Sequence, residues 1–234
     1  MSKSAQLASY LKTHPDVIGK VVDFNPETDR LFEFDLTANN KSLSRETITD
    51  PNKFDTWINR HLHDNNCRYG IGGYMEYRTI YVGIPLFEGE DGPRLLHLGV
   101  DIWGPAETPI YAPLAGKVHS FNDNNNFGDY GPTIILEHNL DRLTLYSLYG
   151  HLSRKSLNGL SLGMEIAAHQ QIATLGAIDE NGNWPPHLHF QLMFDMEDKQ
   201  GDYPGACRYV EKEQYLENIP DPQLLLQFPP AINR

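Results

Sequence analysis

Cysteine, basic residues and long apolar runs are all scarce in this chain of 234 residues. Two cysteines, Cys67 and Cys207, cannot build a disulfide framework, so we expect a reduced cytosolic protein, with a single bridge between them left open. No stretch approaches the roughly 20 apolar residues of a membrane span. The opening residues, MSKSAQLASYL, also lack the apolar run of an export signal, so the chain as written is predicted to be cytoplasmic. A periplasmic or secreted location is expected instead where a leader has been removed.

Basic residues are outnumbered by acidic ones, with 19 Lys and Arg against 31 Asp and Glu, which gives a formal net charge of −12. Such a surface repels phosphate backbones and anionic lipid headgroups, which argues against nucleic-acid binding and against docking on a charged membrane. Partners or substrates are therefore expected to be neutral, cationic or linked to a metal. Hydrophobic residues make up 40% of the chain, which is enough to bury a sizeable core.

The pattern of the sequence changes near residue 66 and predicts three regions. Residues 1–65 are expected to form a mixed, partly helical N-terminal extension. Residues 66–200 carry short apolar runs separated by Gly, Pro and Asn, which is typical of β structure, and 201–234 are expected to form a packed tail. The extension is open to three interpretations: a lid, a scaffold or a docking surface.

Two helices are predicted within the extension. One covers residues 3–13 and ends before His14-Pro15, since the residue before a proline avoids helical geometry. The other begins after Asp50, an N-cap residue, with Pro51 in its first turn, and runs to about residue 65. Its apolar stripe is expected to pack on the rest of the protein; the stripe residues are Phe54, Trp57, Ile58 and Leu62.

The central region predicts a mainly β fold built on an antiparallel sheet. A tight hairpin is expected at 139–142, between two apolar strands. The predicted strands are Thr79–Pro85, Gly99–Trp103, Thr108–Tyr111, Gly116–Phe121, Thr133–His138, Leu143–Tyr149, Glu165–Ala167, Gln171–Leu175 and His187–Phe194.

Histidine is the residue type that points to function, with ten copies that include two His-x-His pairs. His187 and His189 begin a predicted strand, where residues i and i+2 point to the same face about 7 Å apart. One of the two can therefore hold a metal while the other reaches its bound water. His61 and His63 lie on a predicted helix, where side chains two residues apart diverge by about 200°. Only the first pair is expected to be functional.

Five strings of residues, in order along the chain, resemble the lysostaphin-type, or LytM-like, zinc metalloendopeptidases, a family that includes peptidoglycan hydrolases. They are His97-x-Gly99-x-Asp101, PIYAPLAGKV at 109–118, GPTIILEH at 131–138, LYSLYGHL at 145–152 and PHLHFQ at 186–191. The resemblance implies an antiparallel β core with a groove, related to duplicated-hybrid-motif barrels and sandwiches. It also implies that residues 66–200 form a zinc metallopeptidase-like catalytic domain.

The resemblance further implies one zinc ion per chain, held by His97, Asp101 and His189. His151 and His187 match the family's two histidines that bind no metal. Zinc held by three protein groups leaves a fourth position for water and lowers the pKa of that water towards about 7. One of the two free histidines then acts as general base and acid, and the other stabilises the oxyanion. The implied activity is hydrolysis of peptide bonds in peptidoglycan-type or glycine-containing peptides.

Three aromatic residues are candidates for the substrate groove: Tyr130, Tyr149 and Trp184. Core packing is the alternative for the two tyrosines. Trp184 belongs to Trp-Pro-Pro, where the family usually has glycine before Pro-His, so one groove wall is expected to be stiffer and larger. A family glycine is also replaced in the turn at 168–170, which must therefore avoid positive φ or be strained.

Three other functions compete with peptide-bond hydrolysis. Two histidines and a carboxylate also define the iron site of non-haem oxygenases, but the His-x-Asp spacing is absent, since three residues separate His97 from Asp101. A zinc-binding regulatory module without turnover is the second alternative, and the presence of His151 and His187 argues against it. The third is a zinc hydrolase of a cytosolic peptide, amide or ester. The sequence assigns no oligomeric state.

Overall fold

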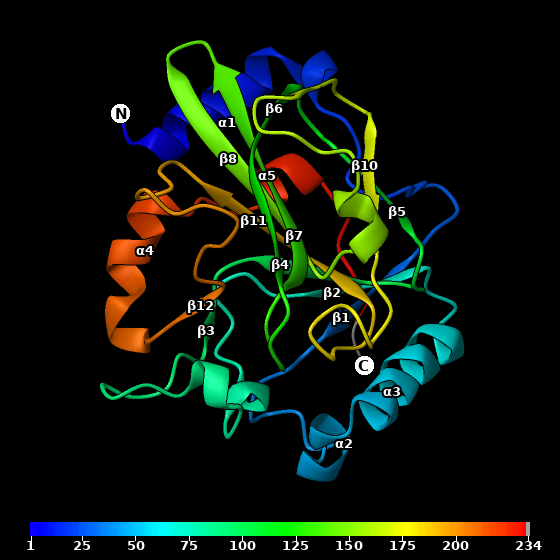
Figure 1. The fold of residues 1–234 in the computed structure, drawn as a ribbon. Helices are drawn as coiled ribbons and strands as arrows, with labels where there is room; N and C mark the ends of the chain where they lie inside the picture. The colour runs from blue at the N-terminus through cyan, green and yellow to red at the C-terminus, as the bar shows by residue number, and fades with distance from the viewer. Residues whose placement is uncertain (233–234) are drawn as a thin grey trace.

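The computed structural model describes residues 1–232 and is built around one eight-stranded sheet with the strand order β1-β2-β4-β11-β8-β7-β6-β9 (Figure 1). Neighbouring strands are antiparallel except for β1 and β2, which are parallel. The predicted mainly β fold with an antiparallel core is therefore confirmed. In the order of the sheet, the strands are Leu31–Phe34, Tyr69–Gly72, Val100–Trp103, His187–Met193, Leu143–Gly150, Gly131–Leu140, Gly116–Asn124 and Glu165–Ile166.

Two small two-stranded sheets flank the large one. The first pairs β10 (Gln171–Thr174) with β5 (Pro109–Tyr111), and the second pairs β12 (Ala206–Cys207) with β3 (Leu96–His97). The α-helices are α1 (Lys3–Thr13), α2 (Arg45–Thr49), α3 (Pro51–Asp64), α4 (Lys212–Asn218) and α5 (Gln223–Leu226). None of the helices found within 1–232 is long and apolar enough to cross a bilayer.

Both predicted helices of the extension are confirmed. Helix α1 ends at Thr13, directly before His14-Pro15. At the start of α3 the Asp50 carboxylate accepts hydrogen bonds from the backbone N–H groups of Asn52 and Lys53, which satisfies donors that have no partner within the helix. The apolar stripe of α3 is buried as predicted, over Phe54, Trp57, Ile58 and Leu62.

The extension packs against the part of the sheet that carries the candidate site. Strand β1 pairs with β2, and the ring of Phe34 at the end of β1 lies 5.3 Å from Trp57 of α3 and 5.2 Å from Trp103 of β4. Helix α1 packs elsewhere, with Leu7 and Leu11 in the main core, and Figure 1 shows α1 and the α2–α3 pair at opposite ends of the molecule. The extension thus contributes to the sheet and to the core.

Strand β2 was not predicted, because its sequence, Tyr-Gly-Ile-Gly, is poor in residues that favour strands. Its glycines are required by two large side chains. A Cβ at Gly70 would lie 2.3 Å from the ring of Phe34, and a Cβ at Gly72 would lie 2.4 Å from the ring of Trp103. The two glycines therefore lower the strand propensity of β2 but leave room for the rings of Phe34 and Trp103.

The strand predicted over 79–85 is wrong. Thr79–Tyr81 (η2) and Pro85–Phe87 (η3) are 3-10 turns. Gly83 between them has φ +81°, which breaks an extended run, and Pro85 has no N–H for a strand partner. Ile80 and Tyr81 are consecutive and both buried, whereas a strand with one solvent-facing side alternates.

One turn prediction is confirmed, and two questions that the sequence left open are answered. Leu140 pairs with Leu143 across a two-residue turn in which Asp141 has φ +55°. His169 has φ +65°, so the turn at 168–170 takes the strained option. Both cysteines are free thiols.

A buried histidine outside the site predicts how stability depends on pH. His138 is fully buried, with Nδ1 2.9 Å from the Ala115 carbonyl and Nε2 2.7 Å from Ser147 Oγ, and burial lowers its pKa to about 4. Between about pH 6.5 and 4 the unfolded chain binds a proton here that the folded chain does not. The free energy of unfolding should therefore fall on acidification by up to about 1.4 kcal/mol per pH unit from this group.

Urea denaturation of wild type and His138→Gln, each with chelator, measures this slope at pH 7.5, 6 and 5. The pH dependence should be shallower in His138→Gln than in wild type. His63→Gln, which changes an exposed histidine, should keep the wild-type slope. Equal slopes in wild type and His138→Gln would refute the assignment.

Candidate metal centre and active site

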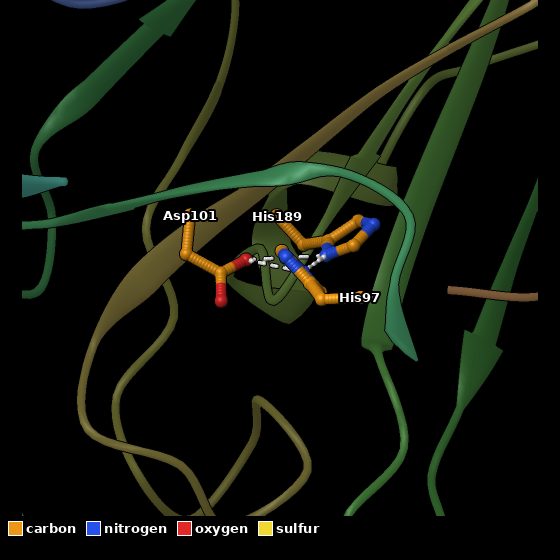
Figure 2. Close-up of side chains that lie close together, drawn as sticks. All are labelled: His97, Asp101 and His189. Atoms are coloured by element: carbon orange, nitrogen blue, oxygen red, sulfur yellow. Dashed lines mark hydrogen bonds and ion pairs between the residues drawn. The ribbon is translucent and has the colours of Figure 1, made fainter. Parts of the chain in front are cut away.

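Three strands bring His97, Asp101 and His189 to one point. His97 ends β3, and Asp101 of β4 lies directly opposite His189 of β11 in the sheet register. His97 Nε2 lies 3.0 Å from His189 Nδ1 and 3.3 Å from Asp101 Oδ1, and His189 Nδ1 lies 3.1 Å from the same oxygen. All three side chains are buried, and Figure 2 shows their ligand atoms pointing at one another.

In both imidazoles of the cluster, the ring proton lies on the nitrogen that points away from the other two side chains. His97 Nδ1 lies 2.9 Å from the Gly73 carbonyl, which can only accept, so we assign the ring proton to Nδ1. His189 Nε2 lies 3.0 Å from Gln191 Oε1, so we assign its proton to Nε2. His97 Nε2, His189 Nδ1 and Asp101 Oδ1 then face one another as three acceptors without a donor.

This donor set fits a zinc ion. Ligand bonds of about 2.0–2.1 Å at tetrahedral angles place ligand atoms about 3.3 Å apart, close to the 3.0–3.3 Å found here. The glycine between His97 and Asp101 is part of the arrangement, because a Cβ at Gly99 would lie 2.6 Å from the imidazole of His189. The hydrogen bonds from His97 Nδ1 to Gly73 and from His189 Nε2 to Gln191 orient the two imidazoles towards the metal position.

Arg78 is a site residue that the sequence analysis missed. Its guanidinium is buried, donates from Nη1 to Asp101 Oδ2 and to Tyr81 OH (2.9 Å), and donates from Nε to Glu76 Oε2 (2.8 Å). Nη2 has no hydrogen-bond partner within the described residues. Arg78 therefore fixes one oxygen of Asp101 and leaves the other to face the histidines.

Burial and charge set the protonation states of this cluster. Burial has the largest effect on the pKa of His97 and the positive charge of Arg78 the second largest, and they lower this pKa to about 4. Burial alone would raise the pKa of Asp101, but its electrostatic interactions with His97 and with the Arg78 guanidinium outweigh burial and hold that pKa well below its usual value. At neutral pH the site therefore offers a carboxylate and a neutral imidazole, the forms that bind a metal.

His151 and His187 lie beside the three-residue cluster, with ring centroids 4.1 Å apart. His151 Nδ1 donates to the Asn181 carbonyl (2.8 Å) and His187 Nδ1 donates to the Pro185 carbonyl (2.7 Å), which leaves Nε2 of each ring as the free nitrogen. His187 Nε2 lies 3.9 Å from Asp101 Oδ1. Burial lowers the pKa of both histidines, so each is a neutral base.

His151 sits at a strained backbone position. It follows the end of β8 with φ +61°, a conformation that costs a residue other than glycine about 1–3 kcal/mol. Its N–H donates to the Tyr130 carbonyl (2.7 Å) and its carbonyl accepts from Gly176 (2.9 Å), which holds the strained geometry in place. Such strain is typical of a functional position.

A cavity of about 210 Å³ opens onto these groups and is lined by His151, His187 and His189 together with Arg78 and Asp101. Among the predicted groove residues, Tyr130 and Trp184 line it. Tyr149 does not: it is fully buried in the core, where its hydroxyl accepts from Ser147 Oγ (3.0 Å). The structure therefore places Tyr149 in the core, which was its alternative interpretation.

Comparison with known proteins finds one family and several relatives. Residues 95–201 match the model of peptidase family M23. An uncharacterized lipoprotein of Escherichia coli strain K12, YgeR, is 36% identical over 96 residues, which cover 41% of this chain and 34% of the lipoprotein. The chain thus spans about a third of the length of that curated relative.

Two solved structures are also similar. A zinc-containing peptidase from Vibrio cholerae is 28% identical, with a TM-score of 0.35, and the match covers 43% of this chain and 28% of that one. The catalytic domain of the antimicrobial peptidase lysostaphin from Staphylococcus simulans is 25% identical, with a TM-score of 0.42. That match covers 68% of this chain and 97% of the domain.

Proposed function

We propose that this chain is a zinc-dependent endopeptidase that hydrolyses peptide bonds, because residues 95–201 match the model of peptidase family M23. The observation that carries the proposal is the convergence of three buried acceptor atoms, from His97, Asp101 and His189, beside two neutral histidines. A binding site for a metal alone needs no such neighbours, whereas amide hydrolysis needs groups that accept and return protons.

The three converging residues would hold the zinc. Bound there, zinc would supply Lewis-acid chemistry, which polarises a carbonyl and lowers the pKa of water. Three protein ligands are the number typical of catalytic rather than closed structural zinc sites. Gly73 and Gln191 orient the two imidazoles, and Arg78 orients the carboxylate.

His151 and His187 move the protons of the reaction. Each has a free Nε2 at the cavity and an Nδ1 proton fixed on a backbone carbonyl, so each can accept one proton at a defined atom. One of the pair removes a proton from the attacking water and returns it to the leaving amine as the C–N bond breaks. The other takes up a proton from solvent at Nε2 as negative charge develops on the substrate oxygen, and then donates a hydrogen bond to that oxyanion.

The substrate is proposed to be a peptide of the peptidoglycan type or one that contains glycine, and residues 66–200 are proposed as the catalytic unit. Part of the cavity lining comes from outside that unit, with Phe54 from α3 and residues 204–206 from the tail. We therefore expect the extension and the tail to be needed for binding of substrate.

A cleavage assay tests the function. The full chain, loaded with one equivalent of zinc, is incubated with isolated peptidoglycan and with a mixture of synthetic peptides, some containing glycine, and products are identified by mass spectrometry. Cleavage that a chelator abolishes and zinc restores is the expected result. Zinc binding without any cleavage would instead support a regulatory module. Iron in the protein as purified, together with oxygen-dependent turnover, would support an oxygenase.

The buried ion pair predicts a role for Arg78 in metal affinity. Arg78→Met frees Asp101 Oδ2 and removes the charge that keeps the carboxylate ionised, so zinc affinity should fall by about 10- to 100-fold. Competition with a chromophoric chelator measures the affinity. Arg94→Met is the matched control, because Arg94 lines the same cavity but donates to the Leu86 carbonyl. Equal affinity in a folded Arg78→Met protein would refute the role.

A further inference from the structure

A second cavity, of about 400 Å³, adjoins the one that holds the histidines. The two cavities share four lining residues: Phe54, Ile80, Gly128 and Trp184. We call the second cavity the Trp184 pocket and define it by Leu43, Ile48, Phe54, Ile80, Ile84 and Trp184. The two cavities therefore adjoin at these four residues.

The lining of the Trp184 pocket selects for apolar groups. Its lining is mainly aliphatic and aromatic, with Val82 and Phe127 beside the six defining residues, whereas the polar side chains among its described lining residues are Arg45, Thr49, Thr79 and Asn183. A cavity of about 150 Å³ with a comparable lining is large enough to hold a benzene ring. The pocket therefore has room for a side chain of the size of leucine or phenylalanine, whereas glycine would leave it unfilled.

Trp184 is held rigidly with respect to the two catalytic histidines. The Asn181 side chain accepts from the Trp184 N–H (3.0 Å) and donates to the Trp184 carbonyl (3.0 Å). The backbone carbonyl of the same Asn181 accepts from His151, and the next carbonyl along, Pro185, accepts from His187. One short loop thus fixes the wall of the pocket and both proton-transfer groups.

We propose that the Trp184 pocket binds a large apolar side chain of the peptide substrate near the scissile bond, so that the substrates are, among the glycine-containing peptides proposed above, those with leucine, phenylalanine or methionine rather than glycine at that one position. The cleavage part of this proposal rests on the proposed function, but the binding part does not. The proposal also assigns a role to the extension, because Leu43, Ile48 and Phe54 place α2 and α3 in the wall of a specificity pocket.

Direct binding tests the pocket without turnover. The zinc-free chain is titrated with N-acetyl-leucinamide and, in parallel, with N-acetyl-glycinamide, and NMR shifts of the Trp184 indole and Ile48 methyl groups are followed. Saturable shifts with the leucine probe and none with the glycine probe are expected. Ile48→Trp and Ile84→Trp, which each place a larger side chain at a lining position, should each remove the shifts of Trp184. Thr56→Trp, on the exposed face of α3, is the matched control and should keep them.

Cleavage then tests the substrate class. For the zinc-loaded chain, kcat/KM for a peptide with leucine at the favoured position should exceed that for its glycine analogue by about 10- to 200-fold, and Ile48→Trp should bring the two values together. Equal binding of both probes, or glycine peptides cleaved equally well in wild type and Ile48→Trp, would overturn the proposal. Probe binding without cleavage of any peptide would support the pocket and contradict the proposed function.

Discussion

Replacement of His151 by alanine is expected to lower kcat by about 10²- to 10⁴-fold while the zinc content stays at one per chain. His151 Nδ1 is bound to the Asn181 carbonyl, so its only free nitrogen is Nε2 at the cavity. His151 is not among the three residues whose ligand atoms converge. Its loss should therefore remove proton transfer or oxyanion stabilisation and leave the metal in place. Single-turnover kinetics and metal analysis on one preparation measure both quantities.

A second variant separates chemistry from backbone strain. Alanine is disfavoured at φ +61°, whereas asparagine tolerates the left-handed region, so His151→Asn should fold without that penalty and still lose turnover. His63→Ala, at an exposed helical histidine, should match wild type in rate and zinc content. Wild-type turnover in zinc-loaded His151→Asn would contradict the role assigned to His151.

Replacement of His97 by alanine is expected to remove the metal itself. Residues that only hydrogen-bond to metal ligands contribute about 10- to 100-fold to affinity, and a direct ligand should contribute more. The variant leaves His189 Nδ1 and Asp101 Oδ1, 3.1 Å apart, as two converging atoms, one short of the set that holds a catalytic zinc. After dialysis against chelator and return to buffer with one equivalent of zinc, wild type should recover stoichiometric metal and His97→Ala should not.

Asp101→Ala should give the same loss by a different route, because it also leaves the buried Arg78 without its partner carboxylate. That variant is expected to be less stable as well, whereas His97→Ala removes a neutral side chain. His61→Ala, from the other His-x-His pair, serves as the control. Stoichiometric zinc in folded His97→Ala would rule out the ligand set.

The positions of the histidines could be predicted because they follow from local geometry. Strand β11 begins at His187, and two-residue alternation on a strand places His187 and His189 on one face, where both line the cavity. His61 and His63 lie on helix α3 as expected, and neither belongs to the cluster. The glycine between His97 and Asp101 is explained only by the structure, since it admits the ring of His189.

Arg78 could not be found from the sequence because its role depends on partners distant in the chain. Asp101 is 23 residues away, and the turn that carries Tyr81 was predicted to be a strand. The residues that flank an arginine in the sequence do not show whether its side chain is buried. Only the tertiary structure shows that the charge of Arg78 is compensated. Tyr149 shows the opposite case: it is close to His151 in sequence but packs into the core.

The contribution of the extension to the site also depends on long-range packing. Strand β1 pairs with β2, and the rings of Phe34 and Trp103 occupy the space that side chains at Gly70 and Gly72 would need. No periodic pattern of apolar residues in the sequence indicates this packing. Trp103 in turn stacks on His187, with centroids 5.5 Å apart. Trp57 and Phe34 of the extension are thus connected to His187, one of the two proposed proton-transfer residues, by a continuous set of aromatic contacts.

The central claim is that His97, Asp101 and His189 hold a catalytic zinc, and anomalous diffraction tests it most directly. Crystals of the full chain grown with one equivalent of zinc are measured above and below the zinc absorption edge. We predict one anomalous peak per chain, within bonding distance of His97 Nε2, Asp101 Oδ1 and His189 Nδ1. A zinc peak that lies elsewhere, or none at these three residues in a zinc-loaded crystal, would contradict the account.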